Sequence, residues 1–259
     1  MLQRLDEQAP AARVLEQVVL EIGVALHGPD VAEQRNPYLE DDLLENPRRR
    51  RLLIEALEHR LREIDKRRSQ DGSDADRDRD RKVGELLAAG RRAVEAFAAA
   101  FERTRKLRDR ARRLLGRHVR GDAIAFDAFA RVSHVTDATD WRVEYPFVVL
   151  YPDAEDEIPG LVRACIELGL SIIPRGGGTG YTGGAIPLTP LAAVINTEKL
   201  ERVSEVEHVA LPGAAGDGLE GRTVPTVYSE AGVVTKRVAD AAERAGFVFA
   251  VDPLSLIHI

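Results

Sequence analysis

The sequence is short of the residues that cross-link chains, anchor them in membranes or stack on bases. A single cysteine, Cys165, among 259 residues leaves no disulfide framework and fits a reducing compartment. Aromatic residues make up only 5% of the chain. No run approaches the roughly 18 apolar residues that a spanning helix needs, and Glu16 and Glu21 interrupt the N-terminal apolar stretch. We expect no membrane-spanning segment, and a location in the cytoplasm or peripheral to the inner face of the membrane.

Charge is distributed unevenly and defines the first half of the chain. Between Arg48 and Arg120 there are 24 Lys/Arg against 13 Asp/Glu, although the whole chain carries a net charge of -6. Leucine and isoleucine recur there at helical spacing. The pattern predicts a helix starting near Arg48, a polar linker at residues 69–80, and a second helix from about Arg81 to His118. Two long helices joined in this way indicate an antiparallel hairpin.

A basic hairpin could bind nucleic acid through phosphate attraction. Its arginines are interleaved with acidic residues, however, as on a solvated helix face with internal salt bridges. No aromatic residues alternate with them to stack on bases. We therefore expect no nucleic-acid partner, and favour docking of the basic helices on acidic parts of the same polypeptide.

The densest glycine segment follows an apolar run. Leu170–Ile173 predicts a buried strand, and six of the eleven residues of Pro174–Gly184 are glycine. Glycine has no Cβ to keep a ligand away from the backbone, and successive N–H groups in such a turn form a nest for an anion. Arg175 and three hydroxyl residues distinguish this segment from a flexible surface loop. It predicts a phosphate-binding loop, with a diphosphate as the usual ligand.

Two familiar phosphate loops do not fit this segment. A Walker A loop ends in Gly-Lys-Ser/Thr, and no lysine lies between Arg175 and Lys199. Residues 178–183 satisfy G-x-G-x-x-G, with Glu198 about twenty residues downstream, but the Rossmann motif needs a helix that opens at its last glycine. The following residues, 185–190, contain two prolines, which oppose a helix interior. The Rossmann interpretation therefore fails on context.

The residues that surround this loop carry a family resemblance. Pro146–Pro152, an acidic helix start and Pro-Arg-Gly-Gly-Gly-Thr-Gly-Tyr-Thr-Gly-Gly resemble the FAD-binding domain of the FAD-linked oxidases. This is the p-cresol methylhydroxylase (PCMH) and vanillyl-alcohol oxidase type of domain, which also occurs in D-lactate, glycolate and D-2-hydroxyglutarate dehydrogenases. The resemblance covers roughly residues 143–253.

The resemblance implies that the loop's N–H groups hold the FAD diphosphate. Covalent flavin attachment often uses a histidine in this loop; there is none here, so non-covalent FAD is implied. It implies no catalytic residue and no metal ligand in this stretch. The implied cofactor-binding residues are Pro174, Arg175, Gly176, Gly177, Gly178, Thr179, Gly180, Tyr181, Thr182, Gly183, Gly184, Gly232, Asp252 and Pro253.

Elements around the loop follow the same family order. The pattern predicts a helix over Asp156–Leu168 that contains a buried Cys165, a strand at Ala192–Asn196, and a surface loop at Leu211–Gly221. The resemblance further implies a strand ending in a glycine turn at Thr226–Val233 and a last strand with its flavin-side turn at Phe247–Pro253. Between them, apolar spacing predicts an amphipathic helix at Thr235–Ala245.

The first half resembles the N-terminal region of large bacterial flavoproteins. The matching segments are residues 35–39, 63–68 and 131–142. In those proteins a helical region precedes a D-lactate-dehydrogenase-like flavin domain and then a ferredoxin-like iron–sulfur section. His134 and Trp141 lie just before the flavin domain, where they either approach the flavin and substrate or pack the domain junction.

The last six residues, Leu254–Ile259, read as translated sequencing-adapter read-through, so we expect a non-native tail after about Pro253. We expect the chain to be an N-terminal fragment, with catalytic and substrate residues in the remaining part. The expected fold is α+β: an α-helical region at 1–130, then the first lobe of a PCMH-type FAD-binding domain at 143–253.

The expected parent protein is an FAD-dependent oxidoreductase. Its partners would be a small 2-hydroxy acid, which it oxidises to a 2-oxo acid, and an electron acceptor, either iron–sulfur clusters in the remaining part or a quinone. Two alternatives remain open. One is an FAD-domain reductase of another substrate class, such as a cell-wall precursor enzyme. The other is a flavin-binding fragment or scaffold without activity.

Overall fold

The computed structural model describes residues 36–67, 74–210 and 223–250. The chain divides into two compact units. The helical unit comprises the residues up to 110 together with 127–129, and the sheet unit comprises residues 111–126 and those from 130 onward.

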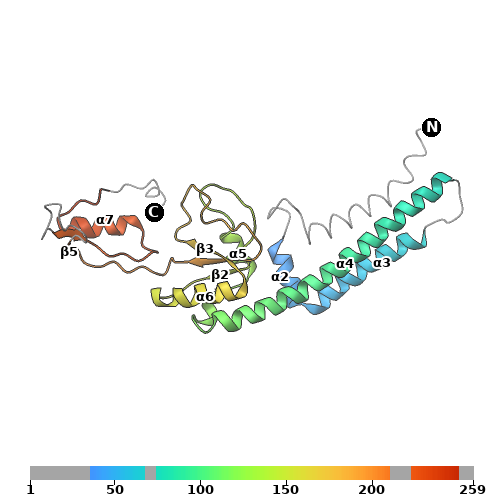
Figure 1. Cartoon of the computed structure of the whole chain (residues 1–259), viewed down its shortest axis with the longest axis horizontal. Helices are drawn as coiled ribbons and strands as arrows, with labels where there is room; N and C mark the ends of the chain where they lie inside the picture. The colour runs from blue at the N-terminus through green and yellow to red at the C-terminus, as the bar shows by residue number, and fades with distance from the viewer. Residues whose placement is uncertain (1–35, 68–73, 211–222, 251–259) are drawn as a thin grey trace. The chain divides into compact units, whose positions relative to one another are not determined.

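The helical unit consists of α2, α3 and most of α4 (Figure 1). Both of the first two helices begin after an asparagine and carry proline in the first turn, the arrangement that best satisfies a helix N-terminus. The Asn36 side chain accepts hydrogen bonds from the N–H groups of α2, and Asn46 does the same for α3. The helices span Pro37–Glu45, Pro47–Lys66 and Asp74–Leu115.

Helices α3 and α4 run antiparallel, as the sequence predicts. Near the C-terminal end of α3, Asp65 pairs with Arg91; near its N-terminal end, the Arg50 guanidinium lies 5.7 Å from the centre of the Phe101 ring. Between these contacts the apolar stripes of both helices form one core with the end of α2. Its buried members are Leu43, Leu44, Leu57, Leu61, Leu87, Val94, Phe97 and Phe101.

The linker expected at residues 69–80 is wrong from Asp74 onward, because α4 already begins there. The alternating acids and arginines of this stretch form ion pairs along the helix: Asp78 contacts both Arg81 and Lys82, and Arg81 also contacts Glu85. Such pairs three and four residues apart favour a helix even without a buried face. Residues 69–73 lie outside the described residues, and α4 ends at Leu115 rather than His118.

The sheet unit is built on a four-stranded sheet in the order β1-β2-β4-β3. The inner strands β2 and β4 are fully buried, and β2, β4 and β3 are mutually parallel, whereas β1 is antiparallel to β2. Val149 and Val194 pack with Ala130 of α5 in its core. The strands are Ile124–Ala125, Val148–Leu150, Ser171–Arg175 and Ala192–Asn196, and α5 is Ala128–Ser133.

Strand β3 differs from the buried strand that the sequence predicts. It lies at the sheet edge beyond β4, so only one of its sides is paired, and its residues are partly or fully exposed. The helix before it, α6 at Ile158–Leu168, packs against β3 and starts later than expected, after a 3-10 turn at Glu155–Glu157. Helix α6 buries Cys165, as predicted, and Gly169 ends it with φ of 71°.

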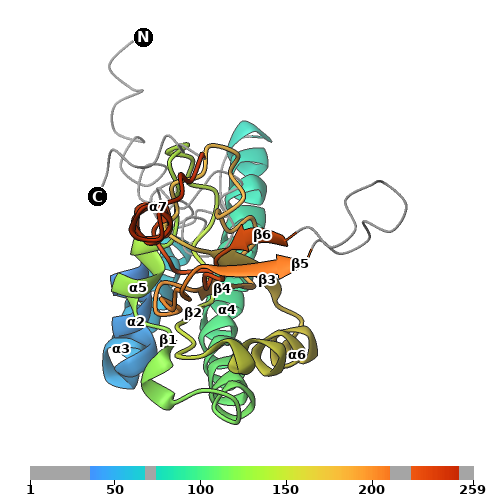
Figure 2. The ribbon, with the colours of Figure 1, turned by 90° about the vertical axis from the view of Figure 1, so that its left-hand side faces the viewer.

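A two-stranded antiparallel hairpin and a last helix follow (Figure 2). These are β5 at Glu207–Ala210, β6 at Thr223–Thr226 and α7 at Thr235–Arg244. The helix agrees with the sequence prediction. The strand expected at 226–233 does not form. Strand β6 ends at Thr226, and only a single bridge, at Ser229, follows it. No strand forms at residues 247–250, where Val248 is 90% exposed and no described strand edge pairs with it.

Candidate functional site

The glycine loop, residues 176–184, leaves the C-terminal end of β3. This is the end of a parallel strand at which open α/β sheets usually bind their ligands. Two positions require glycine for conformation: Gly178 has φ of 67° and Gly183 has φ of 71°. At Gly177 and Gly180, by contrast, a Cβ would meet nothing closer than an ordinary van der Waals contact. The packing of the fold therefore does not require glycine at Gly177 or Gly180.

The glycine loop leaves its hydrogen-bond donors unused. Within the described part of the chain, no main-chain N–H of residues 176–184 donates to another protein group. Backbone donors left unpaired by secondary structure must be satisfied by water or by a ligand. A row of such donors on a glycine turn is the arrangement that binds a phosphate.

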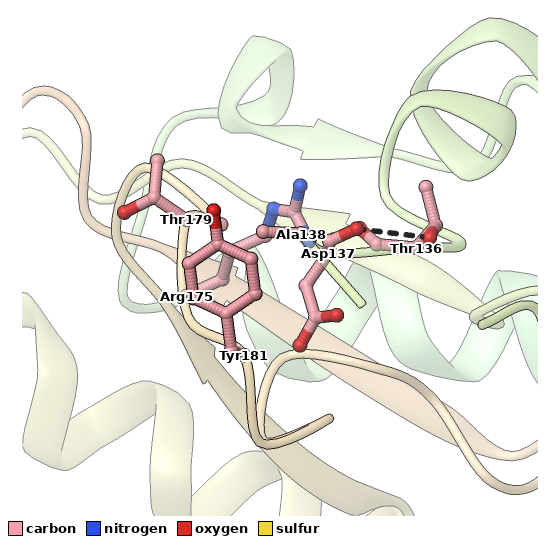
Figure 3. A pocket seen from close by; sticks show the side chains of 7 residues that line it. Thr136, Asp137, Ala138, Arg175, Thr179 and Tyr181 are labelled. Atoms are coloured by element: carbon pink, nitrogen blue, oxygen red, sulfur yellow. Dashed lines mark hydrogen bonds between the residues drawn. The ribbon is translucent and has the colours of Figure 1, made fainter. Parts of the chain in front are cut away.

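A cavity of about 220 Å³ adjoins the glycine loop (Figure 3). Cavities that enclose a whole drug-sized ligand are usually larger, about 300–1,000 Å³, so this one is too small to enclose a dinucleotide completely. Two segments line it: a turn that precedes the sheet's second strand, and the glycine loop with the residue before it. The lining residues are Thr136, Asp137, Ala138, Arg175, Gly178, Thr179 and Tyr181.

Arg175 turns back beneath the loop. Its Nη1 donates to the carbonyl oxygen of Thr136 at 2.7 Å and lies 3.5 Å from that of Ala185. A Cβ at Gly178 would overlap the guanidinium. The guanidinium therefore contacts the loop's inner side, where it braces the backbone.

Asp137 holds the turn at residues 136–139, which we call the Asp137 turn. Its Oδ1 accepts hydrogen bonds from the Thr139 N–H at 2.9 Å and from the Thr139 hydroxyl at 2.5 Å. Burial acts to raise the pKa of Asp137, but the hydrogen bonds from Thr139, the nearby Ala185 backbone and the Arg175 charge together outweigh it and lower the pKa. The carboxylate is thus ionised beside the Arg175 guanidinium.

His134 anchors the same segment to the end of β4. Because the Asn196 side-chain nitrogen can only donate, His134 Nε2 accepts from it at 2.8 Å, and Nδ1–H donates to the Ala130 carbonyl at 2.8 Å. Burial lowers the pKa of His134, with a further contribution from the Arg175 charge. Asn196 also contacts Glu198 at 3.1 Å. This buried neutral imidazole is a packing and anchoring residue in the described structure.

Two exposed aromatic side chains flank the glycine loop. Trp141 is 65% exposed, and the edge of its indole lies 3.6 Å from the position that a Cβ at Gly183 would take. Tyr181, within the loop, is likewise 65% exposed and lines the cavity (Figure 3). Trp141 therefore contacts the loop, while His134 packs beneath it.

The remaining predicted cofactor residues divide into two groups. Pro174 belongs to β3, next to the glycine loop. Gly232 lies against a backbone turn: a Cβ there would overlap the Thr197 carbonyl, and its N–H donates to the Leu200 carbonyl at 2.9 Å. Asp252, Pro253 and the segments 211–221 and 254–259 lie outside the described residues.

The sequence interpretation did not assign the Asp137 turn to the site. A local signal was available, since Asp-x-Thr is a common turn in which the aspartate side chain caps the backbone two residues on. Nothing in that signal says that the turn would reach the glycine loop, about forty residues away along the chain. In the described ranges there is no cluster of side chains suited to a metal ion, and no helix long and apolar enough to cross a membrane.

Comparison with known families matches two separate parts of the chain. Residues 146–259 match a family described as an FAD binding domain. Residues 4–99 match a different family, described as a protein of unknown function (DUF3683). The Asp137 turn lies between the two matches.

Two curated relatives of the FAD-binding domain share its region. A D-lactate dehydrogenase of Archaeoglobus fulgidus is 33% identical over 114 residues, which cover 43% of this chain and 22% of that protein. The glycolate oxidase subunit GlcD of Bacillus subtilis is 28% identical over 126 residues, covering 49% of this chain and 24% of that protein. The chain thus spans less than a quarter of the length of each of these relatives.

A solved structure of alkyldihydroxyacetonephosphate synthase is also similar. It is 19% identical, with a TM-score of 0.41, over 55% of this chain and 28% of that chain.

The described residues of the FAD-binding domain fit an FAD diphosphate. The glycine loop offers unused N–H donors, and backbone without a Cβ at Gly177 and Gly180 is open to a close approach by a ligand. These donors neutralise phosphate charge without a metal ion or a lysine.

Proposed function

We propose that this protein is part of an FAD-dependent oxidoreductase that oxidises a 2-hydroxy acid of the D-lactate or glycolate type to the 2-oxo acid. The observation that carries the proposal is the row of N–H donors on the glycine loop that no described protein group accepts, in a region that matches an FAD binding domain family. Relatives named D-lactate dehydrogenase and glycolate oxidase support the substrate class.

The residues of this chain would bind and orient the cofactor. N–H groups of residues 176–184 would hold the diphosphate, and Arg175 would support them from beneath. Bound FAD supplies the chemistry that takes two electrons from the substrate's α-carbon and hydroxyl group. We assign no catalytic residue within the described residues. We propose non-covalent binding, because the glycine loop contains no histidine.

The electron acceptor is a further part of the proposal. Electrons would leave the reduced flavin for iron–sulfur clusters elsewhere in the parent protein, or for a quinone. The helical unit, which matches a family of unknown function over residues 4–99, is assigned no role in this chemistry.

An anaerobic visible spectrum of the purified full-length parent protein tests this function. We expect flavin absorption bands that bleach when D-lactate or glycolate is added. Bands that persist with both acids but bleach with a reduced nicotinamide cofactor would overturn the substrate class in favour of an FAD-dependent reductase. A protein that is colourless and cannot be reconstituted with FAD would overturn the flavin assignment.

A further inference from the structure

The Arg175 guanidinium links both ends of the glycine loop to one short turn outside the FAD-family match. Arg175, the residue before the loop, donates to the Thr136 carbonyl at 2.7 Å. Ala185, the residue after it, contributes its carbonyl to the same guanidinium at 3.5 Å, and its backbone lies near the Asp137 carboxylate. The loop is thereby closed at its base by contacts with the Asp137 turn.

We propose that Arg175 and Asp137 are positioning residues that hold the glycine loop in its diphosphate-binding shape, so that the Asp137 turn is a functional part of the FAD site. The inference rests on the proposed function. It assigns Arg175 to the loop backbone, and it extends the site to residues that precede the family match at 146.

The glycine loop needs such support because it contributes little of its own. Its N–H groups make no hydrogen bonds to the described protein, and most of its residues carry no side chain that could pack. A chain of this kind loses much conformational entropy when a ligand fixes it. Contacts that fix it beforehand reduce that cost and therefore raise affinity.

The guanidinium suits this role by its shape. It is planar, with several donors in a fixed fork, so a single side chain can contact carbonyl groups on two segments. It also lies directly beneath Gly178, whose positive φ turns the loop. The negative charge of Asp137 favours the charged guanidinium, and Asp137 is itself fixed by two hydrogen bonds from Thr139.

The Asp137 turn has a firm attachment of its own. His134, two residues before Thr136, is buried and bonded to Asn196 at the end of β4. Thr197, the next residue, donates through its hydroxyl to the Arg175 carbonyl at 3.3 Å. Hydrogen bonds therefore attach both the turn and the start of the glycine loop to the C-terminal end of β4, a strand whose five residues are all buried.

The test compares ligand affinities of Arg175→Gln with those of the wild type. FAD and ADP both carry the diphosphate, whereas riboflavin does not. We expect Arg175→Gln to weaken FAD and ADP binding at least about tenfold, the size expected for losing a hydrogen bond to a charged group. Riboflavin binding should change less than about twofold on the same scale. Arg163→Gln removes a guanidinium from the exposed face of α6 and should change none of the three.

Two further measurements separate positioning from general stability. The ligand-free melting temperature of Arg175→Gln should stay close to that of the wild type. Arg175→Lys, which keeps the charge and a single donor nitrogen, should recover part of the lost FAD affinity. Asp137→Asn should also weaken FAD binding. Its control, Asp140→Asn, changes an exposed residue three positions later and should leave FAD affinity unchanged.

The outcomes distinguish a failure of the positioning role from a failure of the proposed FAD-dependent function. Wild-type protein that binds FAD, with Arg175→Gln binding equally well, overturns the positioning role alone. Equal losses for FAD, ADP and riboflavin together with a lowered melting temperature also overturn it, because they indicate a general structural role. Wild-type protein that binds no FAD overturns the proposed function and the inference together.

Discussion

The helical unit and the glycine loop treat their polar groups in opposite ways. Along α3 and α4 charged side chains pair within the helices or between them, as Glu102 does with Arg105 and Asp65 with Arg91. In the glycine loop, the donors of residues 176–184 contact no described protein group. The difference shows where polar groups are already paired within the protein and where donors stay available to a ligand. Substitutions in the two regions should therefore separate unfolding from loss of cofactor.

Leu61→Ala should give the largest effect on stability. Leu61 is 2% exposed in the core between α3 and α4, and Gly90 on α4 allows it a close approach. Removing a buried leucine side chain leaves a cavity and costs about 3 kcal/mol. Urea unfolding followed by circular dichroism measures the change. FAD affinity should be unaffected, and a parallel loss of FAD binding would contradict the separation of the two regions.

Asp41→Asn should give the next effect. Asp41 accepts from the Arg108 guanidinium at 2.8 Å, and their side chains are only 13% and 8% exposed. Losing a hydrogen bond between charged partners in such a site costs about 2 kcal/mol in the free energy of unfolding. The control is Asp78→Asn, whose exposed ion pairs contribute little. Equal melting temperatures for the two variants would show that the buried pair contributes no more than an exposed one.

The contribution of His134 to the stability of the sheet unit should depend on pH. The pKa of folded His134 lies below its ordinary value of 6.5, so the unfolded chain takes up this proton more readily. Below that pH the folded state should therefore lose stability on account of His134. We expect the melting temperature of the wild type to exceed that of His134→Gln at about pH 7.5, and the difference to shrink at about pH 5.5. A difference that widens at low pH would show that the folded imidazole is protonated.

The helices were the most predictable part of the fold. The spacing of apolar residues is a local signal, and it indicated α3, α7 and the antiparallel pairing of α3 with α4. The prediction of a linker up to residue 80 was wrong, because the charged side chains there form ion pairs along a helix instead of being solvated separately. Edge position is not a local property, so the sequence could not show that β3 would be half-exposed while β4 is buried.

The candidate site was predictable only in part. Glycine density pointed to the loop, because the backbone chemistry of an anion nest is written in consecutive residues. The support beneath it joins Thr136 to Arg175 across 39 positions and depends on where the sheet places both segments. Trp141 and Gly183 meet for the same reason. Contacts of this length follow from the fold and not from any motif.

The most direct test of the central claim is the FAD affinity of Gly177→Val. The fold has room for a Cβ at position 177, because the closest contact of that atom would be an ordinary 3.7 Å to Thr179. A substitution of Gly178, in contrast, would strain the loop because the φ of this residue is positive. Gly121→Val, at another open glycine, is the matched control. Equilibrium dialysis should show wild type and control binding FAD alike, and Gly177→Val binding about a hundredfold more weakly, since its side chain blocks the diphosphate from the backbone. Undiminished binding by Gly177→Val would contradict the assignment of the glycine loop as the diphosphate site.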